Sequence, residues 1–132
     1  MSLLLKILII IGTFWTMEFI AWATHKYIMH GFLWNLHKDH HQINKDKILE
    51  NNDAFFLIFA IPGATFMILG STLLYIGIGI TLYGFAYFLV HEIFIHQRIK
   101  IFRRTRIKYF KVIRKAHKIH HKSRSKDNGT CF

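Results

Sequence analysis

The sequence predicts an all-α fold: an integral membrane helical bundle with three, at most four, membrane helices and a cytosolic histidine-rich helical cap. The chain is 52% hydrophobic and yet carries a formal net charge of +11, which indicates separate membrane-buried and water-exposed parts. All ten histidines fall into four short clusters, none of them deep inside an apolar run. With 132 residues the whole chain, 1–132, is expected to form one domain.

The first membrane helix is predicted over about residues 3–22. This stretch is almost wholly apolar and has about the ~20 residues that cross a hydrocarbon core of ~30 Å. A cleaved signal peptide is the alternative, because Lys6 precedes an apolar run and the segment Ala21–Ala23 resembles a cleavage site. The apolar run is long for a signal peptide and leads directly into the first histidine cluster, so we favour a membrane helix.

One acidic residue, Glu18, lies inside this first span. It precedes His25 by seven residues, so the two side chains are about 20° apart around a helix. A carboxylate at that depth is costly and is a candidate for a functional role, here in orienting a histidine ring. A hydrogen bond to another helix, without a chemical role, is an equally good interpretation.

A helical hairpin is predicted over the next apolar region, which runs from 54 to 90 without a charge. One helix of that length would be roughly 55 Å long, too long for the bilayer core, so the chain must turn back at Gly70-Ser71. The two spans are about 54–69, with a kink expected at Pro62, and 72–90. Asn51–Asp53 forms an N-cap run before the hairpin. Within the second span a stripe of small residues is suited to close helix packing, namely Gly77, Thr81 and Gly84.

Residues 97–122 are predicted to form a basic amphipathic segment, followed by a tail over 123–132. The stretch from Gln97 to Phe132 holds 13 of the 18 Lys and Arg residues. Apolar residues recur in it at helical spacing, which is typical of a helix on a membrane surface with its basic face outward. These residues are Phe102, Tyr109, Ile113 and Ala116. Membrane lipid accounts for the charge, as would an acidic electron-transfer partner, so no nucleic-acid partner is expected.

The topology brings all four histidine clusters to one membrane face. A hairpin returns the chain to the side that it left, and no later stretch is apolar enough to cross again. The positive-inside rule puts the basic C-terminal segment, and with it every histidine, in the cytoplasm, and the N-terminus outside.

The histidines are expected to bind metal. Two clusters have the spacing H-x4-H and two have H-x2-H-H; their members are His25, His30, His37, His40, His41, His91, His96, His117, His120 and His121. On an α-helix H-x2-H-H places three rings within about 100°, whereas H-x4-H places two rings about 140° apart, flanking a point beside the helix. A single histidine is usually an ordinary core or surface residue, but clusters that contain every histidine favour a metal site.

The ligand set restricts the metal without naming it. Neutral imidazole suits iron, copper and zinc, and ten imidazoles are about right for two ions. The single cysteine, Cys131, can build neither a disulfide framework nor a cysteine zinc site. One reaction that suits two imidazole-bound metal ions beside a bilayer is the activation of dioxygen to attack a C–H bond. Zinc cannot catalyse this step, because it has no redox chemistry. The nearest acids, Asp39 and Glu92, are candidates for orienting the rings from behind, with solvated surface charges as the alternative.

Three stretches of the chain resemble the bacterial-type beta-carotene hydroxylases, within the membrane fatty-acid hydroxylase and sterol desaturase superfamily. They are Thr24–His41, His91–Arg98 and Ala116–Lys122. The histidine clusters by themselves indicate only the superfamily. The H-G-F-L-W stretch from His30 to Trp34 is specific to the carotenoid branch.

The resemblance implies a non-haem di-iron monooxygenase that hydroxylates carbon 3 of beta-ionone rings, converting beta-carotene through beta-cryptoxanthin to zeaxanthin. It implies two iron ions, dioxygen as co-substrate, a ferredoxin-type electron donor and a place in the bacterial cytoplasmic membrane. All ten histidines match the ligand positions of the family. Glu92 stands where many relatives have Asp, and the chain ends at Phe132, somewhat early for the family.

Two alternatives remain open at this point. The first is the same chemistry on another membrane lipid, a fatty acid or a sterol. The second is a metal transporter or another metal-binding membrane protein, which would place ligands near the bilayer midplane.

Overall fold

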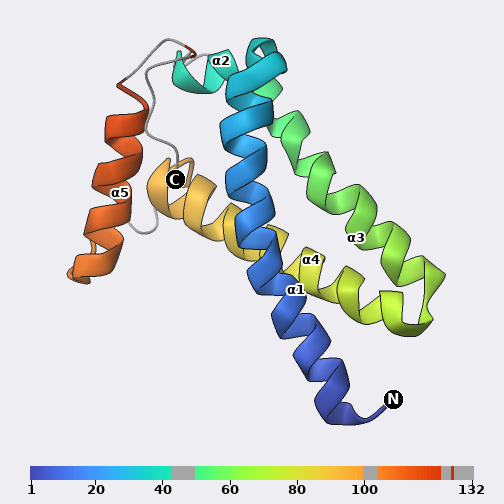
Figure 1. The fold of residues 1–132 in the computed structure, drawn as a ribbon. Coiled ribbons are helices and arrows are strands. Elements are labelled where there is room, and N and C mark those ends of the chain that lie inside the picture. Colours follow the sequence, from blue (N-terminus) through green and yellow to red (C-terminus); the bar gives the residue numbers. More distant parts are fainter. Residues whose placement is uncertain (43–49, 100–103, 123–125, 127–132) are drawn as a thin grey trace. The chain divides into compact units, whose positions relative to one another are not determined.

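The computed structural model describes residues 1–42, 50–99, 104–122 and 126. All regular structure in these ranges is helical, which confirms the all-α prediction. Figure 1 shows the elements in chain order: α1 (Leu3–Ala23), η1 (Thr24–Phe32), α2 (Trp34–His41), η2 (Asn51–Phe56), α3 (Leu57–Leu69), α4 (Ser71–Phe88), η3 (Leu89–Ile95) and α5 (Lys108–His120). Of the η elements, η1 and η3 are π-helices and η2 is a 3₁₀-helix.

Three helical runs are long and apolar enough to cross a membrane: Leu3–Phe32, Asn51–Leu69 and Ser71–Ile95. This confirms the three predicted spans, with later ends than expected for the first and the third. Both extensions are π-helical turns: η1, after α1, contains His25 and His30, and η3, after α4, contains His91 and ends directly before His96. The helical runs therefore continue to the metal-binding candidates instead of ending before them.

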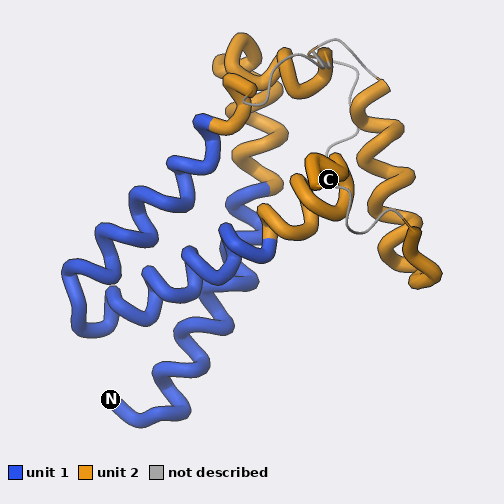
Figure 2. The backbone as a smooth tube through the Cα atoms, turned by 180° about the vertical axis from the view of Figure 1, so that it is seen from behind, with its two compact units in different colours: residues 1–21, 54–86 blue, residues 22–53, 87–132 orange. Residues whose placement is uncertain are grey.

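The described chain divides into two compact units, coloured separately in Figure 2. The first unit comprises Met1–Ala21 and Ala54–Ala86, and the second comprises Trp22–Asp53 and Tyr87–Phe132. Each unit is thus built from two segments that are distant in the sequence. Every histidine belongs to the second unit.

The first unit is an apolar helix packing. Gly70, with φ 70°, and Ser71, with φ 53°, form the turn between α3 and α4, as the sequence predicts. A Cβ at Gly77 would lie 2.7 Å from the carbonyl oxygen of Gly63 in α3, so only glycine permits this close approach. The predicted small-residue stripe therefore packs against α3. Gly79, which the stripe does not include, has the same role against α1.

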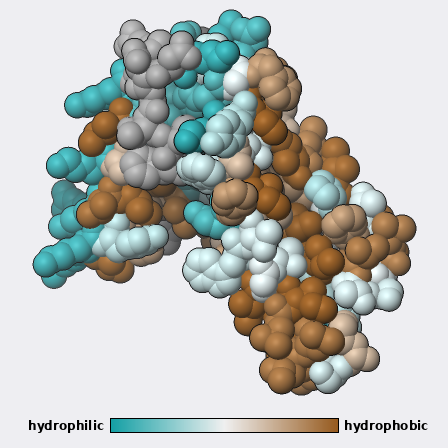
Figure 3. Space-filling view, viewed as in Figure 1, coloured by the Kyte–Doolittle hydropathy of each residue, from teal (hydrophilic) through white to brown (hydrophobic). Residues whose placement is uncertain are grey.

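Large apolar side chains cover the outside of the first unit. Trp15 is 68% exposed and Ile68 is 83% exposed. Figure 3 shows apolar surface over α1, α3 and α4 and hydrophilic surface over α5. Apolar surface of this extent is typical of a membrane-facing protein, because lipid removes the cost of exposing it to water. Pro62 lies inside α3, and the kink expected there stays a prediction.

In the second unit α5 packs on η3. The Phe94 and Phe110 rings are 4.8 Å apart, and Arg114 donates to the Phe94 carbonyl oxygen at 2.7 Å. Within the predicted amphipathic segment 97–122, helix α5 covers Lys108–His120. Gln97, with φ 58°, ends the preceding helical run in a left-handed conformation.

The outer surface of α5 has two stripes. Lys108, Lys111, Lys115 and Lys118 are all exposed and lie along one side. Tyr109, Val112 and Ile119, 68%, 64% and 49% exposed, form an apolar stripe beside them. Of the apolar residues predicted for the inner face, Ile113 and Ala116 are half-buried, Tyr109 points outward, and Phe102 lies outside the described residues.

Candidate metal centre

The two H-x4-H pairs owe their geometry to π-helical turns. A π-helix closes i→i+5 hydrogen bonds, so residues five apart lie nearly above one another. The His96 N–H donates to the His91 carbonyl oxygen at 2.9 Å in this pattern, and the two rings are 4.6 Å apart. The rings of His25 and His30 are 4.9 Å apart. The α-helical expectation of rings about 140° apart was therefore wrong: each pair shares one face.

The two H-x2-H-H clusters lie on short helices, as predicted. His37, His40 and His41 are the buried residues of α2. His117 and His120 are the buried residues of α5, and His121 follows directly at its C-terminal cap. His37 and His120 are the largest fully buried side chains among the described residues, so polar rings occupy the centre of the second unit.

Nine of the ten histidines form two groups in which the candidate ligand nitrogens lie within 4.8 Å of one another. The five-histidine group contains His25, His30, His37, His41 and His120. The four-histidine group contains His40, His96, His117 and His121. Each of α2 and α5 contributes to both groups, because the members of H-x2-H-H point to different sides.

The distances between ring nitrogens fit shared metal ions. Two nitrogens at ~2.1 Å from an ion are roughly 3.0–3.4 Å apart for angles between 90° and tetrahedral. In the five-histidine group the Nε2 atom of His37 lies 3.2 Å from the Nε2 atoms of both His25 and His41. In the four-histidine group the distances are slightly shorter than this range: the Nε2 atom of His117 lies 2.9 Å from that of His96 and 2.8 Å from that of His121.

Hydrogen-bond partners at Nδ1, on the side of the ring away from the candidate metal position, orient two of the rings so that Nε2 faces that position. His37 Nδ1 donates to Asn52 Oδ1 at 2.6 Å, and His40 Nδ1 donates to Glu50 Oε2 at 2.7 Å. Because these oxygens can only accept, each Nδ1 carries the proton and each Nε2 keeps its lone pair. Nε2 of His40 is buried without a hydrogen-bond partner among the described residues, as expected for a ligand atom.

Burial keeps the rings neutral. Desolvation is the main cause that lowers the pKa of His37 to about 3, of His96 to about 2 and of His121 to about 3. Burial and the neighbouring imidazoles hold the pKa values of His40 and His117 well below the usual range. Neutral imidazole is the form that binds a metal ion, so near neutral pH the site is ready for ligation.

His91 lies beside the four-histidine group but outside it. Its ring is 4.7 Å from the ring of His117 and stacks on Tyr87 at 4.9 Å. Its Nδ1 donates to Glu92 Oε1 at 2.6 Å, which leaves Nε2 as the lone-pair nitrogen. Glu92 thus contacts the ring of its neighbour in the chain, and its role behind a metal ligand stays a prediction.

The other two predicted acids have different partners. Asp39 accepts from the backbone N–H of Asn51 at 2.6 Å and so holds the start of η2 to α2. Glu18 belongs to the first unit and accepts from the hydroxyl of Tyr83 at 2.9 Å. This is the inter-helix hydrogen bond of the alternative interpretation, and a role for Glu18 or Asp39 behind a ligand stays a prediction.

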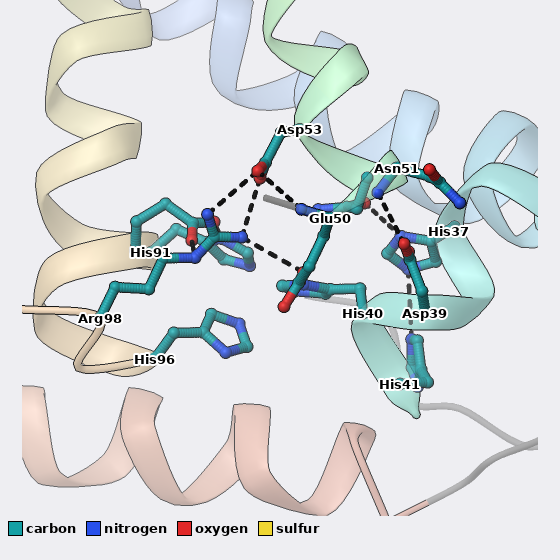
Figure 4. A network of polar contacts seen from close by, with 12 residues as sticks. His37, Asp39, His40, His41, Glu50, Asn51, Asp53, His91, His96 and Arg98 are labelled. Carbon is teal, nitrogen blue, oxygen red and sulfur yellow. Dashed lines mark hydrogen bonds and ion pairs between the residues drawn. The ribbon is translucent and has the colours of Figure 1, made fainter. Parts of the chain in front are cut away.

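Sequence reasoning missed Asn52, which accepts from His37, and it missed Glu50, Asp53 and Arg98, which belong to the network in Figure 4. Asn52 and Asp53 were interpreted only as part of an N-cap run. One signal was present for three of them: Glu50, Asn52 and Asp53 precede the predicted second span, on the membrane side assigned to the histidines. The ion pair between Arg98 and Asp53 could not be predicted from the sequence pattern, because the two residues are 45 positions apart.

Comparison with known proteins relates the chain to hydroxylases. The beta-carotene hydroxylase of Pantoea ananas is 40% identical over 129 residues, which cover 95% of this chain and 73% of that protein. The beta-carotene hydroxylase of Paracoccus sp. (strain PC1) is 35% identical over 132 residues, covering 96% of this chain and 81% of that protein. A chloroplastic beta-carotene 3-hydroxylase of an Oncidium hybrid cultivar is 36% identical over 119 residues, covering 84% of this chain and 39% of that protein.

No solved structure matches the chain. The family model for fatty acid hydroxylases matches residues 10–131, a range that includes all four histidine clusters. The match agrees with the membrane-spanning helices and with the two histidine groups. The chain belongs to the fatty acid hydroxylase family.

Proposed function

We propose that the protein hydroxylates carbon 3 of the beta-ionone rings of beta-carotene, giving beta-cryptoxanthin and then zeaxanthin. The observation that carries this proposal is the pair of histidine groups, each able to gather four or five imidazole nitrogens around one ion. Bacterial relatives named beta-carotene hydroxylase, among them those of Paracoccus sp. (strain PC1) and Pantoea ananas, support the substrate. Fatty acids and sterols are the competing substrates of the wider family.

Two iron ions are the cofactor that we propose. The five-histidine group would hold one ion and the four-histidine group the other, with His91 as the tenth ligand on the side of the four-histidine group. When bound, iron supplies the redox chemistry for dioxygen activation that zinc lacks. The fit rests on the spacing of the Nε2 atoms and on the buried Nε2 of His40, which has no other partner among the described residues.

The residues of the chain orient the ligands and exclude water. Asn52 and Glu50 fix two rings from behind, so that little reorganisation accompanies metal binding. Burial of His37 and His120 keeps bulk water out of the centre. Each hydroxylation consumes one dioxygen, two electrons and two protons: one oxygen atom enters the C–H bond as hydroxyl, and the other leaves as water.

The substrate would reach this site from the bilayer. A carotenoid is an apolar hydrocarbon that dissolves in lipid, and two of the histidine pairs lie at the ends of the apolar runs Leu3–Phe32 and Ser71–Ile95. A ring that moves along these helices therefore meets imidazoles where the apolar runs end. A ferredoxin-type protein is the proposed electron donor, and the formal net charge of +11 favours an acidic partner.

We also propose a topology with the N-terminus outside and the histidines and C-terminus in the cytoplasm. The lysine stripe of α5 supports it through the positive-inside rule. In a Cys131→Ser background, Lys111→Cys in intact bacterial cells should react with a membrane-impermeant maleimide only after permeabilisation. Labelling in intact cells would place α5 outside and reject this orientation.

The substrate is tested in cells that make beta-carotene. Expression of the full chain should give beta-cryptoxanthin and zeaxanthin in the carotenoid extract. His37→Ala should give neither, whereas Lys118→Ala, which changes an exposed side chain of α5, should leave the products unchanged. Hydroxylated fatty acids or sterols without any hydroxylated carotenoid would reject the carotenoid assignment and favour the other lipids.

A further inference from the structure

We infer that Arg98 is a positioning residue for the four-histidine group and for His91, acting through the two carboxylates that hold their rings. The inference rests on the proposed function, in which His40 and His91 ligate a metal ion. Arg98 does not itself contact an imidazole in a hydrogen bond of the described network. It contacts Glu50 and Glu92, and each of these accepts the Nδ1 proton of one histidine.

The guanidinium joins three carboxylates: those of Glu50 and Asp53, which Figure 4 labels, and that of Glu92. Its Nη2 and Nη1 donate to Asp53 Oδ1 and Oδ2 at 2.8 and 3.1 Å, a two-pronged pair. Its Nε lies 2.6 Å from Glu92 Oε2, and Nη2 lies 3.2 Å from Glu50 Oε2. A planar guanidinium with five N–H donors suits several carboxylates at once, whereas a lysine ammonium is a single point charge.

The two glutamates connect the guanidinium to the rings. Glu92 uses one oxygen for each partner, since Oε1 accepts from His91 and Oε2 faces Arg98. Glu50 uses the same oxygen, Oε2, for His40 and for Arg98. Without Arg98 the carboxylates of Glu50, Asp53 and Glu92 would repel one another and lose the group that fixes their rotation. The rings that they orient would then lose their fixed direction.

The backbone directs Arg98 back toward this cluster. The preceding residue, Gln97, has φ 58°, a conformation that residues other than glycine rarely take. The Arg98 N–H then donates to the Glu92 carbonyl oxygen at 3.1 Å, which ties the turn to η3. The side chain is 29% exposed, so its ion pairs are partly shielded from water.

Two rings of the five-histidine group have neutral partners instead: Asn52 Oδ1 accepts from His37, and the carbonyl oxygen of Lys126 accepts from His30. Loss of the Arg98 guanidinium should therefore weaken metal binding by the four-histidine group and leave metal binding by the five-histidine group unchanged. A residue that merely stabilised the whole protein would affect both ions alike.

The test measures metal binding by the full-length protein in nanodiscs under anaerobic conditions. Ferrous iron is titrated and the bound iron per chain is determined by elemental analysis after removal of free metal. The native chain should bind two ions. Arg98→Gln should lower the affinity for the ion of the four-histidine group by about 10- to 100-fold, a range typical for the loss of a residue that orients a metal ligand. The affinity for the ion of the five-histidine group should stay unchanged. Arg98→Lys should give a smaller loss of the same ion, and Arg104→Gln, at an exposed arginine, should match the native chain.

The outcomes separate this inference from the proposed function. Fewer than two ions on the native chain would reject the proposed di-metal centre. Two ions bound by the native chain and by Arg98→Gln with equal affinity would reject the role of Arg98 alone. Equal weakening of both ions would also reject it, because that result indicates general destabilisation. If Arg98→Gln fails to insert, judged by helical circular dichroism and size exclusion, Arg98→Lys decides by the same criteria.

Discussion

The five-histidine and four-histidine groups both take ligands from α2 and from the α5 cluster, yet different chemistry holds their rings. Behind the five-histidine group stand an amide oxygen and a backbone carbonyl oxygen, from Asn52 and Lys126. Glu50 stands behind the four-histidine group, and Arg98 links Glu50 to the Glu92 carboxylate that holds the adjacent His91. A carboxylate raises the basicity of the imidazole that donates to it, whereas a neutral acceptor does so less. The helices α2 and α5 thus supply ligands to both groups, His25 and His30 complete one group and His96 the other, and the partners of the rings make the two groups unequal.

Loss of a ligand should have the largest effect. His120→Ala removes a member of the five-histidine group, and His117→Ala removes a member of the four-histidine group. Each should lower carotenoid hydroxylation by at least ~100-fold, more than the loss of a residue behind a ligand, and should release the ion of its own group first. Product analysis and iron content check this in membranes with equal amounts of inserted protein. Near-native activity in either variant would break the assignment of shared ligation.

Loss of a residue behind a ligand should have a smaller and group-specific effect. Asn52→Ala should weaken the ion of the five-histidine group by about 10- to 100-fold, and Glu50→Ala should weaken that of the four-histidine group by a similar factor. Glu50→Gln keeps an acceptor for His40 and should lose less. Asn51→Ala is the matched control for Asn52→Ala, because the backbone N–H of Asn51 makes its recorded hydrogen bond. If Asn52→Ala weakened only the other ion, the grouping would be wrong.

Acid should destabilise the metal-free protein. His37 is neutral in the folded protein down to a pKa of about 3, whereas the unfolded chain binds that proton below about pH 6.5. The unfolded state therefore holds more protons between these values, and the stability falls as the pH drops through this window. For the almost fully buried His37 the free energy of unfolding should fall by about 1.4 kcal/mol for each pH unit within this window. Thermal unfolding of the metal-free protein between pH 7 and pH 5 measures it, and a midpoint independent of pH would contradict the neutral buried ring.

The smallest effect should arise in the first unit, away from the metal-binding candidates. Tyr83→Phe removes the hydroxyl that donates to Glu18 and should cost about 1 kcal/mol of stability. Iron content should stay at the native value, because every histidine belongs to the second unit. Thermal unfolding and iron analysis together check the expectation. Loss of iron from Tyr83→Phe would show that Glu18 acts on the metal centre after all.

The sequence predicts the parts of this molecule that depend on local patterns. Hydropathy, glycine placement and helical periodicity predict three apolar runs, the turn at Gly70-Ser71 and the helical setting of the two H-x2-H-H clusters. The angle of about 140° predicted between the rings of each H-x4-H pair is wrong, because it holds for an α-helix and the chain forms π-helical turns at both pairs. A spacing of five residues matches the i→i+5 period of a π-helix, so the signal was present in the sequence.

The division of the histidines into two groups could not be predicted. His40 and His41 are neighbours in the chain and yet belong to different groups, because the partition depends on how α2 faces α5 and the π-helical turns. The partners behind the rings are equally non-local: Asn52 lies 15 residues from His37, and Arg98 lies 45 residues from Asp53. Tertiary packing, which single-sequence patterns do not contain, selects these contacts.

The most direct test of the two-ion centre is X-ray absorption at the iron edge, combined with the iron-to-protein ratio, on the purified full-length protein. The account predicts two irons per chain, each surrounded by nitrogen and oxygen ligands at roughly 2.0–2.2 Å with no sulfur neighbour. One iron per chain, or a shell that contains sulfur, would contradict the division of the histidines into two metal-binding groups.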